Sequence, residues 1–455
     1  MQTPNYGEMF RKYIYPLYET TLRGRSTFKY YKEYEKNQWL SPDEIKHIQW
    51  VKLKKLLEHS YKNVEYYKQQ WRNIGATPKD IKTLDDYRRL PILDKQMIRQ
   101  HYDELIAKNH HHSTRTKKTG GSTGVPLRFE FDDESDQRRN AVMWRGYRWA
   151  GNKMGNKSLY IWGAPIDEED KQKKFKDACY NYITRKKILN SFALSENTIN
   201  EYVEQINRYK PINLVGYVAP LIIIGKYIQK ESLTVANLSS IITGAEILHE
   251  FQRELLEDVF NCPVYNTYGC REFMLIASEC GQSKGLHINT DHLLVETIDD
   301  NGNEINNKPG KVIITDLHNY GMPFIRYING DIAVLDERIC DCGRGLPIMS
   351  SIQGRELDII RTPDGRIVPG EYFPHLIKEI SSIKEFQVVQ YKLNKIKIYL
   401  VLQTGGLAVS DERYLRNKIS NTLGDKVYIS FEYLDKIPRT NTGKLRVTMS
   451  CLSDC

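Results

Sequence analysis

The chain has 455 residues, of which 40% are hydrophobic and 27% are charged, and its formal net charge is +9. This composition is ordinary for a globular protein and gives no case for disorder, and the length favours two or three domains over one core. Lys and Arg are interleaved with acidic residues, so the positive charge predicts a solvated surface, and we expect no nucleic-acid partner.

Neither the N-terminus nor the cysteine pattern indicates export. Residues 1–6 lack the basic and then apolar signature of a secretory signal, and no apolar run approaches the roughly 18 residues needed to cross a bilayer. We therefore expect a cytoplasmic protein without a transmembrane segment. The eight cysteines are scattered, which favours reduced thiols or a metal site over a disulfide scaffold.

The first 110 residues predict a helical lead-in. Aromatic and aliphatic residues recur at helical spacing between Phe10 and Tyr18, and Ser41 before Pro42 is a typical helix start. We expect this Tyr-rich segment to pack on the main body. Docking to a partner or to a membrane-associated complex is the alternative use, since basic and aromatic residues together suit an interface.

A glycine-rich stretch at residues 119–126 predicts a phosphate-binding loop. Glycine lets the backbone approach a ligand closely. The hydroxyls of Ser122 and Thr123 can then bind phosphate oxygens together with backbone N–H groups. The stretch matches neither the Walker nor the dinucleotide pattern, and a polar surface loop is the plain alternative. The histidines at 110–112, just upstream, favour a solvated loop over a metal site. The candidate phosphate-binding residues are Thr119, Gly120, Gly121, Ser122, Thr123 and Gly124.

The central part of the chain predicts a layered α/β domain. Short apolar strands alternate with helical patterns, which is typical of a mainly parallel sheet with ligands at the strand ends. Beyond Gly281 the pattern changes to strands and turns, and we expect a distorted β-barrel attached to the sheets. About 100 C-terminal residues then predict a small α+β domain. The expected central strands are 159–162, 212–217, 240–243 and 264–268, and the expected helices are 198–209 and 250–260.

Five motifs follow one another along the chain in a fixed order. They are residues 119–126, 268–272, 330–331, 354–355 and 439–444. In this order they resemble the adenylate-forming acyl-ligase superfamily, and within it the phenylacetate-CoA ligases and the CapK-like proteins of capsular polysaccharide biosynthesis. The resemblance runs from about Leu56 to the C-terminal tail. It implies an N-terminal AMP-binding domain at 1–357 and a mobile C-terminal lid domain at 358–455, with the hinge at Asp358.

The resemblance also implies the roles of individual residues toward ATP. Asp331 matches the carboxylate that accepts the ribose hydroxyls, and Arg355 matches an arginine that faces the nucleotide. Tyr268 is expected to stack on adenine, and Asn266 to lie near its amino group, although a strand-end tyrosine is more often a core residue. The remaining nucleotide-binding candidates are Gly244, Ala245, Glu246, Thr267 and Gly269.

Three residues are expected to carry the chemistry. Glu272 matches the acidic residue that binds Mg²⁺, and Lys444 matches the lysine that bridges the carboxylate and the α-phosphate once the lid closes. Arg271 replaces a hydroxyl residue common in the superfamily, and its guanidinium suits a phosphate or carboxylate. Val125 stands where many members have lysine, so the loop is less charged than usual.

A second constellation predicts a zinc site. Cys340 and Cys342 form a tight Cys-x-Cys turn, and Cys280 with His287 lies upstream. Thiolates and imidazole are ligands of tetrahedral zinc, and related acyl ligases have a similar arrangement. Free thiols are the alternative, because the gap between the halves is longer than in a zinc finger.

The expected function is the ATP-dependent activation of a carboxylic acid as an acyl-adenylate, followed by transfer to coenzyme A. Two alternatives stay open. The acceptor could be an amine or a sugar-linked group in surface polysaccharide assembly, or the chain could be a non-catalytic nucleotide-binding subunit of a glycan-assembly complex. Trp162, Tyr217 and Tyr265 at strand ends are pocket candidates for an aromatic or amphipathic acid, with core packing as the alternative. The family likeness suggests a homodimer.

Overall fold

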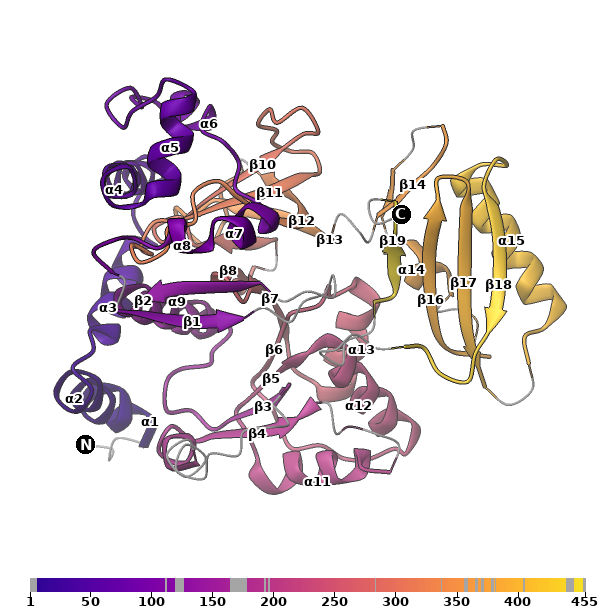
Figure 1. Ribbon diagram of the computed structural model, residues 1–455. Helices are drawn as coiled ribbons and strands as arrows, with labels where there is room; N and C mark the ends of the chain where they lie inside the picture. Colours follow the sequence, from indigo (N-terminus) through magenta and orange to yellow (C-terminus); the bar gives the residue numbers. More distant parts are fainter. Residues whose placement is uncertain are drawn as a thin grey trace.

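The structure is a computed structural model in which a large body is joined to a smaller C-terminal unit (Figure 1). The large sheet, the covering helices and the separate small sheet confirm the expected α/β fold. The residues that the structure describes are 6–110, 113–118, 127–163, 178–191, 194, 197–282, 284–336, 338–355, 359–364, 367–369, 372–377, 380, 382–403, 406–438 and 446–452.

Within these residues, one large sheet has eleven strands in the order β10-β11-β12-β13-β9-β8-β7-β6-β5-β3-β4. Its parallel half has its apolar residues on both faces, as expected for strands covered by helices on each side. The parallel strands are β3 (Ser158–Trp162), β4 (Lys186–Asn190), β5 (Asn213–Tyr217), β6 (Ser240–Gly244) and the first part of β7 (Val264–Cys270).

Three helices pack on this parallel half and close its core. They are α11 (Ile199–Tyr209), α12 (Val218–Lys230) and α13 (Glu250–Phe260). The side chains of Leu159, Leu214 and Ile241, one from each of three neighbouring strands, are fully buried against them. The helix boundaries expected at 198–209 and 250–260 are therefore confirmed to within a residue.

The antiparallel half continues from β7 without a break. The first residues of β7 pair in parallel with β6, and Thr267 to Cys270 pair antiparallel with β8. The strands expected as an attached barrel are thus hydrogen-bonded, in the described residues, into the same sheet as the parallel strands. They are β8 (Met274–Glu279), β9 (Leu286–Ile288), β10 (Leu293–Ile298), β11 (Gly310–Asp316), β12 (Tyr327–Asp336) and β13 (Ile348–Arg355).

A two-stranded hairpin carries the glycine-rich stretch between its strands. β1 (Thr114–Lys118) and β2 (Arg128–Asp132) pair antiparallel, and α9 (Asp133–Trp149) begins directly after β2 with the Asp132 side chain accepting from the amide of Ser135. Residues 119–126 lie outside the described residues. The strands that flank it end at Lys118 and begin at Arg128, which pair with each other (Figure 1).

The N-terminal region is helical, as expected. Ser41 caps α4 in a reciprocal capping box with Glu44. Two π-helical turns, which the spacing did not predict, interrupt the first helix. The helices are α1 (Tyr6–Met9), η1 (Phe10–Ile14), α2 (Tyr15–Leu17), η2 (Tyr18–Leu22), α3 (Thr27–Asn37), α4 (Pro42–Asn63), α5 (Glu65–Asn73), α6 (Leu84–Arg88), α7 (Lys95–Gln100) and α8 (Tyr102–Leu105).

The C-terminal unit has its own sheet and core. The sheet order is β18-β17-β16-β19, and α15 (Val409–Leu423) buries Leu415 and Ile419 against it. The hinge residue Asp358 lies outside the described residues, so the domain boundary at 357/358 stays a prediction. The other elements are β14 (Ile359–Arg361), β15 (Ile367–Pro369), α14 (Tyr372–Ile377), β16 (Ile383–Lys392), β17 (Lys395–Leu402), β18 (Tyr428–Tyr433) and β19 (Thr448–Ser450).

None of the helices in the described ranges is both long enough and apolar enough to cross a bilayer.

Candidate active site

Two of the predicted pocket aromatics meet at the carboxyl ends of neighbouring strands. Trp162 ends β3 and Tyr217 ends β5, and their ring centroids are 4.3 Å apart. Tyr265, from β7, packs with Trp162 against the same small apolar cluster. Trp162 and Tyr217 are therefore in ring contact, and Tyr265 shares an apolar cluster with Trp162.

The segment Gly244 to Glu246 follows β6 at the same edge. A Cβ atom on Gly244 would lie 2.8 Å from the Thr267 hydroxyl and 3.8 Å from the Trp162 ring, so glycine allows the close approach here. Ala245 has φ of +66°, an unusual conformation for a residue with a side chain. The Glu246 carboxylate accepts from the amide of Ala219 at the start of α12, at 2.6 Å.

Thr267 and Asn266 of β7 contact the end of β6. The Thr267 hydroxyl donates to the carbonyl of Thr243 at 2.6 Å, and the Thr243 hydroxyl donates to Asn266 Oδ1 at 3.3 Å. These bonds fix the two strand ends relative to each other beyond their ladder pairing. They engage the side-chain oxygen of Asn266, and the role predicted for its side-chain nitrogen stays a prediction.

Asp331 is the centre of a buried hydrogen-bond group. Its Oδ2 accepts from the Tyr268 hydroxyl at 2.7 Å and from Asn329 Nδ2 at 2.8 Å. Tyr268 is only 7% exposed, and burial, followed by the Asp331 carboxylate, raises its pKa well above the ordinary value. Tyr268 is therefore a hydrogen-bond donor that orients Asp331. Its stacking on adenine stays a prediction.

Arg355 is opposite Asp331 in the ladder between β12 and β13. The two residues predicted to face the nucleotide are 24 residues apart in the sequence and are neighbours in the sheet. The backbone of Arg355 is described, and its side chain lies outside the described residues.

Glu272 is held in a similar way by a second tyrosine. The hydroxyl of Tyr327 donates to Glu272 Oε1 at 3.0 Å, and Glu272 is 6% exposed. Tyr327 and Asn329 were missed from the sequence. Both lie on β12 at two-residue steps before Asp331, so they share its face of the strand, and that alternation is the signal that could have found them.

Arg271 connects this region to the hairpin. Its Nε donates to the carbonyl of Lys118, at 3.2 Å, at the last residue of β1. The guanidinium therefore lies where the glycine-rich segment begins. That segment, Thr119 to Gly124, and the lysine Lys444 both lie outside the described residues, so their roles rest on the sequence.

The predicted zinc ligands are brought together. The ligand atoms of Cys280, His287, Cys340 and Cys342 all lie within 4.8 Å of one another. The sulfurs of Cys280 and Cys340 are 3.7 Å apart, and Cys342 Sγ is 3.3 Å from His287 Nε2. Tetrahedral zinc with bonds of about 2.3 Å to sulfur separates two sulfurs by about 3.8 Å, so the residues fit the ion.

The electrostatics differ among the residues of this cluster. His287 Nδ1 bonds to the Leu346 carbonyl at 3.1 Å, which leaves Nε2 for a metal, and burial lowers the pKa of His287 to about 4, so the ring is neutral. Burial raises the pKa of Cys280 to about 12. Burial acts in the same direction on Cys342, but hydrogen bonds from Arg344 bring its pKa below the ordinary value.

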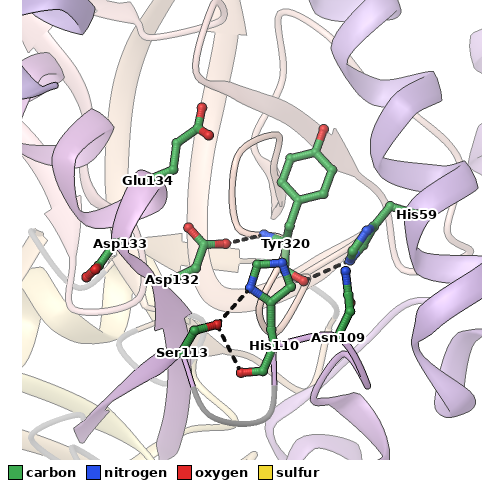
Figure 2. Close-up of a pocket in the computed structure, with 8 residues that line it drawn as sticks. All are labelled: His59, Asn109, His110, Ser113, Asp132, Asp133, Glu134 and Tyr320. Carbon is green, nitrogen blue, oxygen red and sulfur yellow. Dashed lines mark hydrogen bonds between the residues drawn. The ribbon is translucent and has the colours of Figure 1, made fainter. Parts of the chain in front are cut away.

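An open pocket of about 470 Å³ lies at the other end of the hairpin (Figure 2). His59 and His110 line one side, and Asp132 accepts from the backbone amide of Tyr320 at 2.8 Å. Asp132 also accepts from Ser135 and Gly321, so its carboxylate is used to fix the chain. The predicted site residues that the structure describes are not among those lining this pocket, and His111 and His112 lie outside the described residues.

Comparisons with known proteins place this geometry in context. The model of the CapK C-terminal domain matches residues 360–450. Protein CapK of Staphylococcus aureus is 24% identical over 94% of both chains. The phenylacetate-coenzyme A ligase of Thermus thermophilus is 23% identical over 90% of this chain and 96% of its own.

Solved structures show the same fold. A 2-hydroxyisobutyryl-CoA ligase in its postadenylation state, in complex with 2-HIB-AMP, aligns with a TM-score of 0.71 at 17% identity, over 91% of each chain. The covered lengths show that both the large body and the C-terminal unit take part in the match. The chain is thus a relative of CapK and of the phenylacetate-coenzyme A ligases, and it has the fold of the adenylate-forming ligases.

Proposed function

We propose that this chain is an AMP-forming ligase that activates a carboxylic acid as an acyl-adenylate and then transfers the acyl group to coenzyme A. The observation that carries the proposal is the pair of buried carboxylates, Asp331 and Glu272, each held by a tyrosine hydroxyl. The fold match to a ligase in complex with an acyl-adenylate supports it.

In the proposed reaction, a carboxylate oxygen of the acid attacks the α-phosphorus of ATP. The bond to the bridging oxygen breaks, pyrophosphate leaves with those electrons, and the acyl-adenylate remains. Positioning and charge neutralisation are what such a reaction needs most. Asp331 would accept the ribose hydroxyls, with Arg355 facing the nucleotide, and the backbone and hydroxyls of residues 119–124 would surround the terminal phosphates.

Three residues would relieve charge at the reacting atoms. Glu272 would hold Mg²⁺, which neutralises the triphosphate, and Arg271 would contact the α-phosphate or the substrate carboxylate. Lys444 would bridge the two reactants. In the second step the thiolate of coenzyme A attacks the acyl carbon, and AMP leaves.

The acid is proposed to be aromatic or amphipathic. Trp162, Tyr217 and Tyr265 would form the wall of the acyl pocket, which is supported by the ring contact of Trp162 with Tyr217 and by the cluster that Trp162 shares with Tyr265. A flat apolar group fits against such rings better than a strongly polar one does.

A second acceptor has specific support. The C-terminal unit matches the CapK C-terminal domain, and the whole chain aligns with CapK over 94% of its length. In adenylate-forming ligases this unit is expected to close over the second substrate. An amine or sugar-linked acceptor in surface polysaccharide assembly is therefore the alternative to coenzyme A.

The test is ATP–pyrophosphate exchange with a panel of aromatic, aliphatic and amino-acid carboxylates, each with and without coenzyme A. Exchange with one acid, converted by coenzyme A into net ATP consumption, supports the proposal. Exchange that coenzyme A does not convert into net ATP consumption favours the amine or sugar acceptor. No exchange with any acid contradicts the proposed activity.

Variants connect the activity to the named residues. Lys444→Ala should abolish exchange while ATP still binds, because the lysine is needed only at the reacting atoms. The matched control is Lys436→Ala, an exposed lysine of the same unit. Equal exchange in the two variants would remove Lys444 from the mechanism.

We also propose that the Cys280, His287, Cys340 and Cys342 cluster holds a structural zinc ion. The purified chain should contain about one zinc per molecule, and Cys340→Ser should lose the metal and lower the thermal unfolding temperature. Cys262→Ser, at a buried thiol outside the cluster, is the control. Only trace zinc in the wild-type protein would contradict the site.

A further inference from the structure

A second cavity lies between the N-terminal helices and the amino ends of β3 and β4. Its volume is about 150 Å³, which is the size of cavity that holds a molecule like benzene. The residues lining it include the rings of Tyr15, Trp144, Tyr160 and Tyr180. The lining residues nearest the candidate active site include Tyr160, which is two residues, or about 7 Å along β3, from Trp162. Lys186 lies at the far end of the strand pair, opposite Ser158, and none of the predicted active-site residues is among those lining the cavity.

Lys186 brings an uncompensated positive charge to the cavity. It is the first residue of β4, and its ammonium lies 4.0 Å from the centre of the Tyr160 ring. Among the residues that the structure describes, no carboxylate pairs with it. Burial alone lowers its pKa, which is the effect expected for an ammonium without a counter-ion.

The one carboxylate of the cavity wall already has two partners. Glu19 is 2% exposed and lies 3.8 Å from Arg23 Nη1 and 3.9 Å from Arg25 Nε. Arg25 also pairs with Asp136 of α9. The cavity is therefore lined by three cationic side chains, those of Arg23, Arg25 and Lys186, and by one carboxylate, that of Glu19. When Asp136 is counted as well, the net charge is still +1.

Two further donors of the wall are unsatisfied within the described residues. The Thr27 hydroxyl has no hydrogen-bond partner, although the residue is only 1% exposed, and Arg25 Nε has none either. Buried donors without partners are rare, because leaving one unpaired costs about 1–3 kcal/mol. A hydrogen-bond acceptor in the cavity would give the Thr27 hydroxyl and Arg25 Nε a partner.

We propose that this cavity binds a small oxyanion, the carboxylate or phosphate group of a small molecule, through Lys186, Thr27 and Arg25. The rings around it leave room for a flat apolar part of that molecule. The ligand would join the N-terminal helices to the edge of the sheet, since Thr27 begins α3 and Lys186 begins β4. This inference does not depend on the proposed adenylation.

The test is isothermal titration calorimetry of the full chain with inorganic phosphate and, separately, with benzoate. At least one probe should bind saturably. The probe with the higher affinity indicates whether the cavity takes a phosphate or a carboxylate group. Lys186→Met should weaken this binding about tenfold or more, the factor for losing a hydrogen bond to a charged group. Lys187→Met is the matched control, because its ammonium bonds to Gln205 instead.

Two outcomes would overturn the proposal. One is no saturable binding of either probe, and the other is equal binding by wild type and Lys186→Met, which would assign the anion to another site. Thr27→Val provides an isosteric second variant in case the lysine variant fails to fold. On the unmodified chain, phosphate or benzoate should also slow the carbamylation of Lys186 by cyanate, read by peptide mass spectrometry, while leaving that of Lys187 unchanged.

Discussion

At the scale of single residues, two tyrosines determine how the site carboxylates are presented. Tyr268 donates to Asp331 and Tyr327 donates to Glu272. A neutral donor fixes the direction of a carboxylate without cancelling its charge. In each carboxylate, one oxygen is therefore oriented by a tyrosine hydroxyl.

Tyr268→Phe should weaken ATP binding without abolishing catalysis. The variant removes the Tyr268 donor to Asp331, and a hydrogen bond to a charged group is worth about 1.5–3 kcal/mol, so KM for ATP should rise about tenfold or more. Steady-state kinetics of pyrophosphate release would measure the change. Tyr327→Phe is the matched comparison, since it should instead raise the Mg²⁺ concentration needed for half-maximal rate. An unchanged KM in Tyr268→Phe would contradict the holding role.

His292 gives the stability of the large body a pH dependence. The ring is fully buried against Tyr34 and stacks on His318, and burial lowers the pKa of His292 to about 3. The unfolded ring has a pKa of about 6.5, so between these values the unfolded state binds more protons and stability falls as pH falls.

At pH 5 this single ring should cost about 2 kcal/mol of unfolding free energy relative to pH 7.5. Denaturant unfolding at the two pH values would measure the loss, and His292→Gln should reduce it. The exposed residue His47, changed to Gln, should leave the loss unchanged. A pH dependence that is the same in all three proteins would contradict the assignment.

At the scale of elements, α9 is fixed to the antiparallel half by buried arginines. Arg145 makes a two-pronged ion pair with Asp291, both bonds 2.8 Å long, and also donates to Asn289 Oδ1 at 2.6 Å. Arg139 pairs with Asp316 at 2.7 Å. A helix held by charges at 0% and 1% exposure has one permitted position on the sheet.

Arg145→Met should destabilise the large body by about 3–5 kcal/mol, because Asp291 would remain buried without its partner. Arg148→Met is the control from the same helix. Its ion pair with Glu35 is half exposed, and such a pair is worth at most about 1 kcal/mol. Chemical denaturation of the two variants would compare them, and equal losses would contradict the special role of the buried pair.

At the scale of the whole molecule, the C-terminal unit has a core of its own. Its buried cluster is built from residues 360–429 and includes Leu415, Ile396 and Ile398 at 0% exposure. A unit with a separate core and a separate sheet can unfold by itself. The large body and this unit should therefore give separate transitions on heating.

Leu415→Ala should lower only the transition of the C-terminal unit, by about 2–5 kcal/mol, the usual cost of a buried leucine. Leu214→Ala, at an equally buried position of the large sheet, should lower only the other transition. Differential scanning calorimetry of the full chain would separate the two effects. A single transition shifted by both variants would show that the molecule unfolds as one unit.

The sequence predicted the parts of the molecule whose signal is local. The strand ends and the capped helix at Ser41 follow from periodicity and capping. The four-ligand cluster is not local, since Cys280 and Cys340 are 60 residues apart, and its prediction rested on ligand chemistry and on the family resemblance. Tyr268 and Asp331, which are 63 residues apart, meet only through the sheet order, so neither periodicity nor spacing predicts their bond. Strand β4 was missed because its two lysines, Lys186 and Lys187, hide the apolar pattern.

The change of partner within β7 restricts how this chain can vary in length. One residue inserted after Asn266 would leave the parallel half in place and turn every later side chain of β7 to the opposite face. The side chains of Thr267 and Tyr268 would each point to the opposite face of the sheet, and the pairing of β7 with β8 would shift by one residue. Variation in length should therefore collect in exposed turns such as Asp300 to Gly302, and natural chains with this sheet should keep β7 at a constant number of residues.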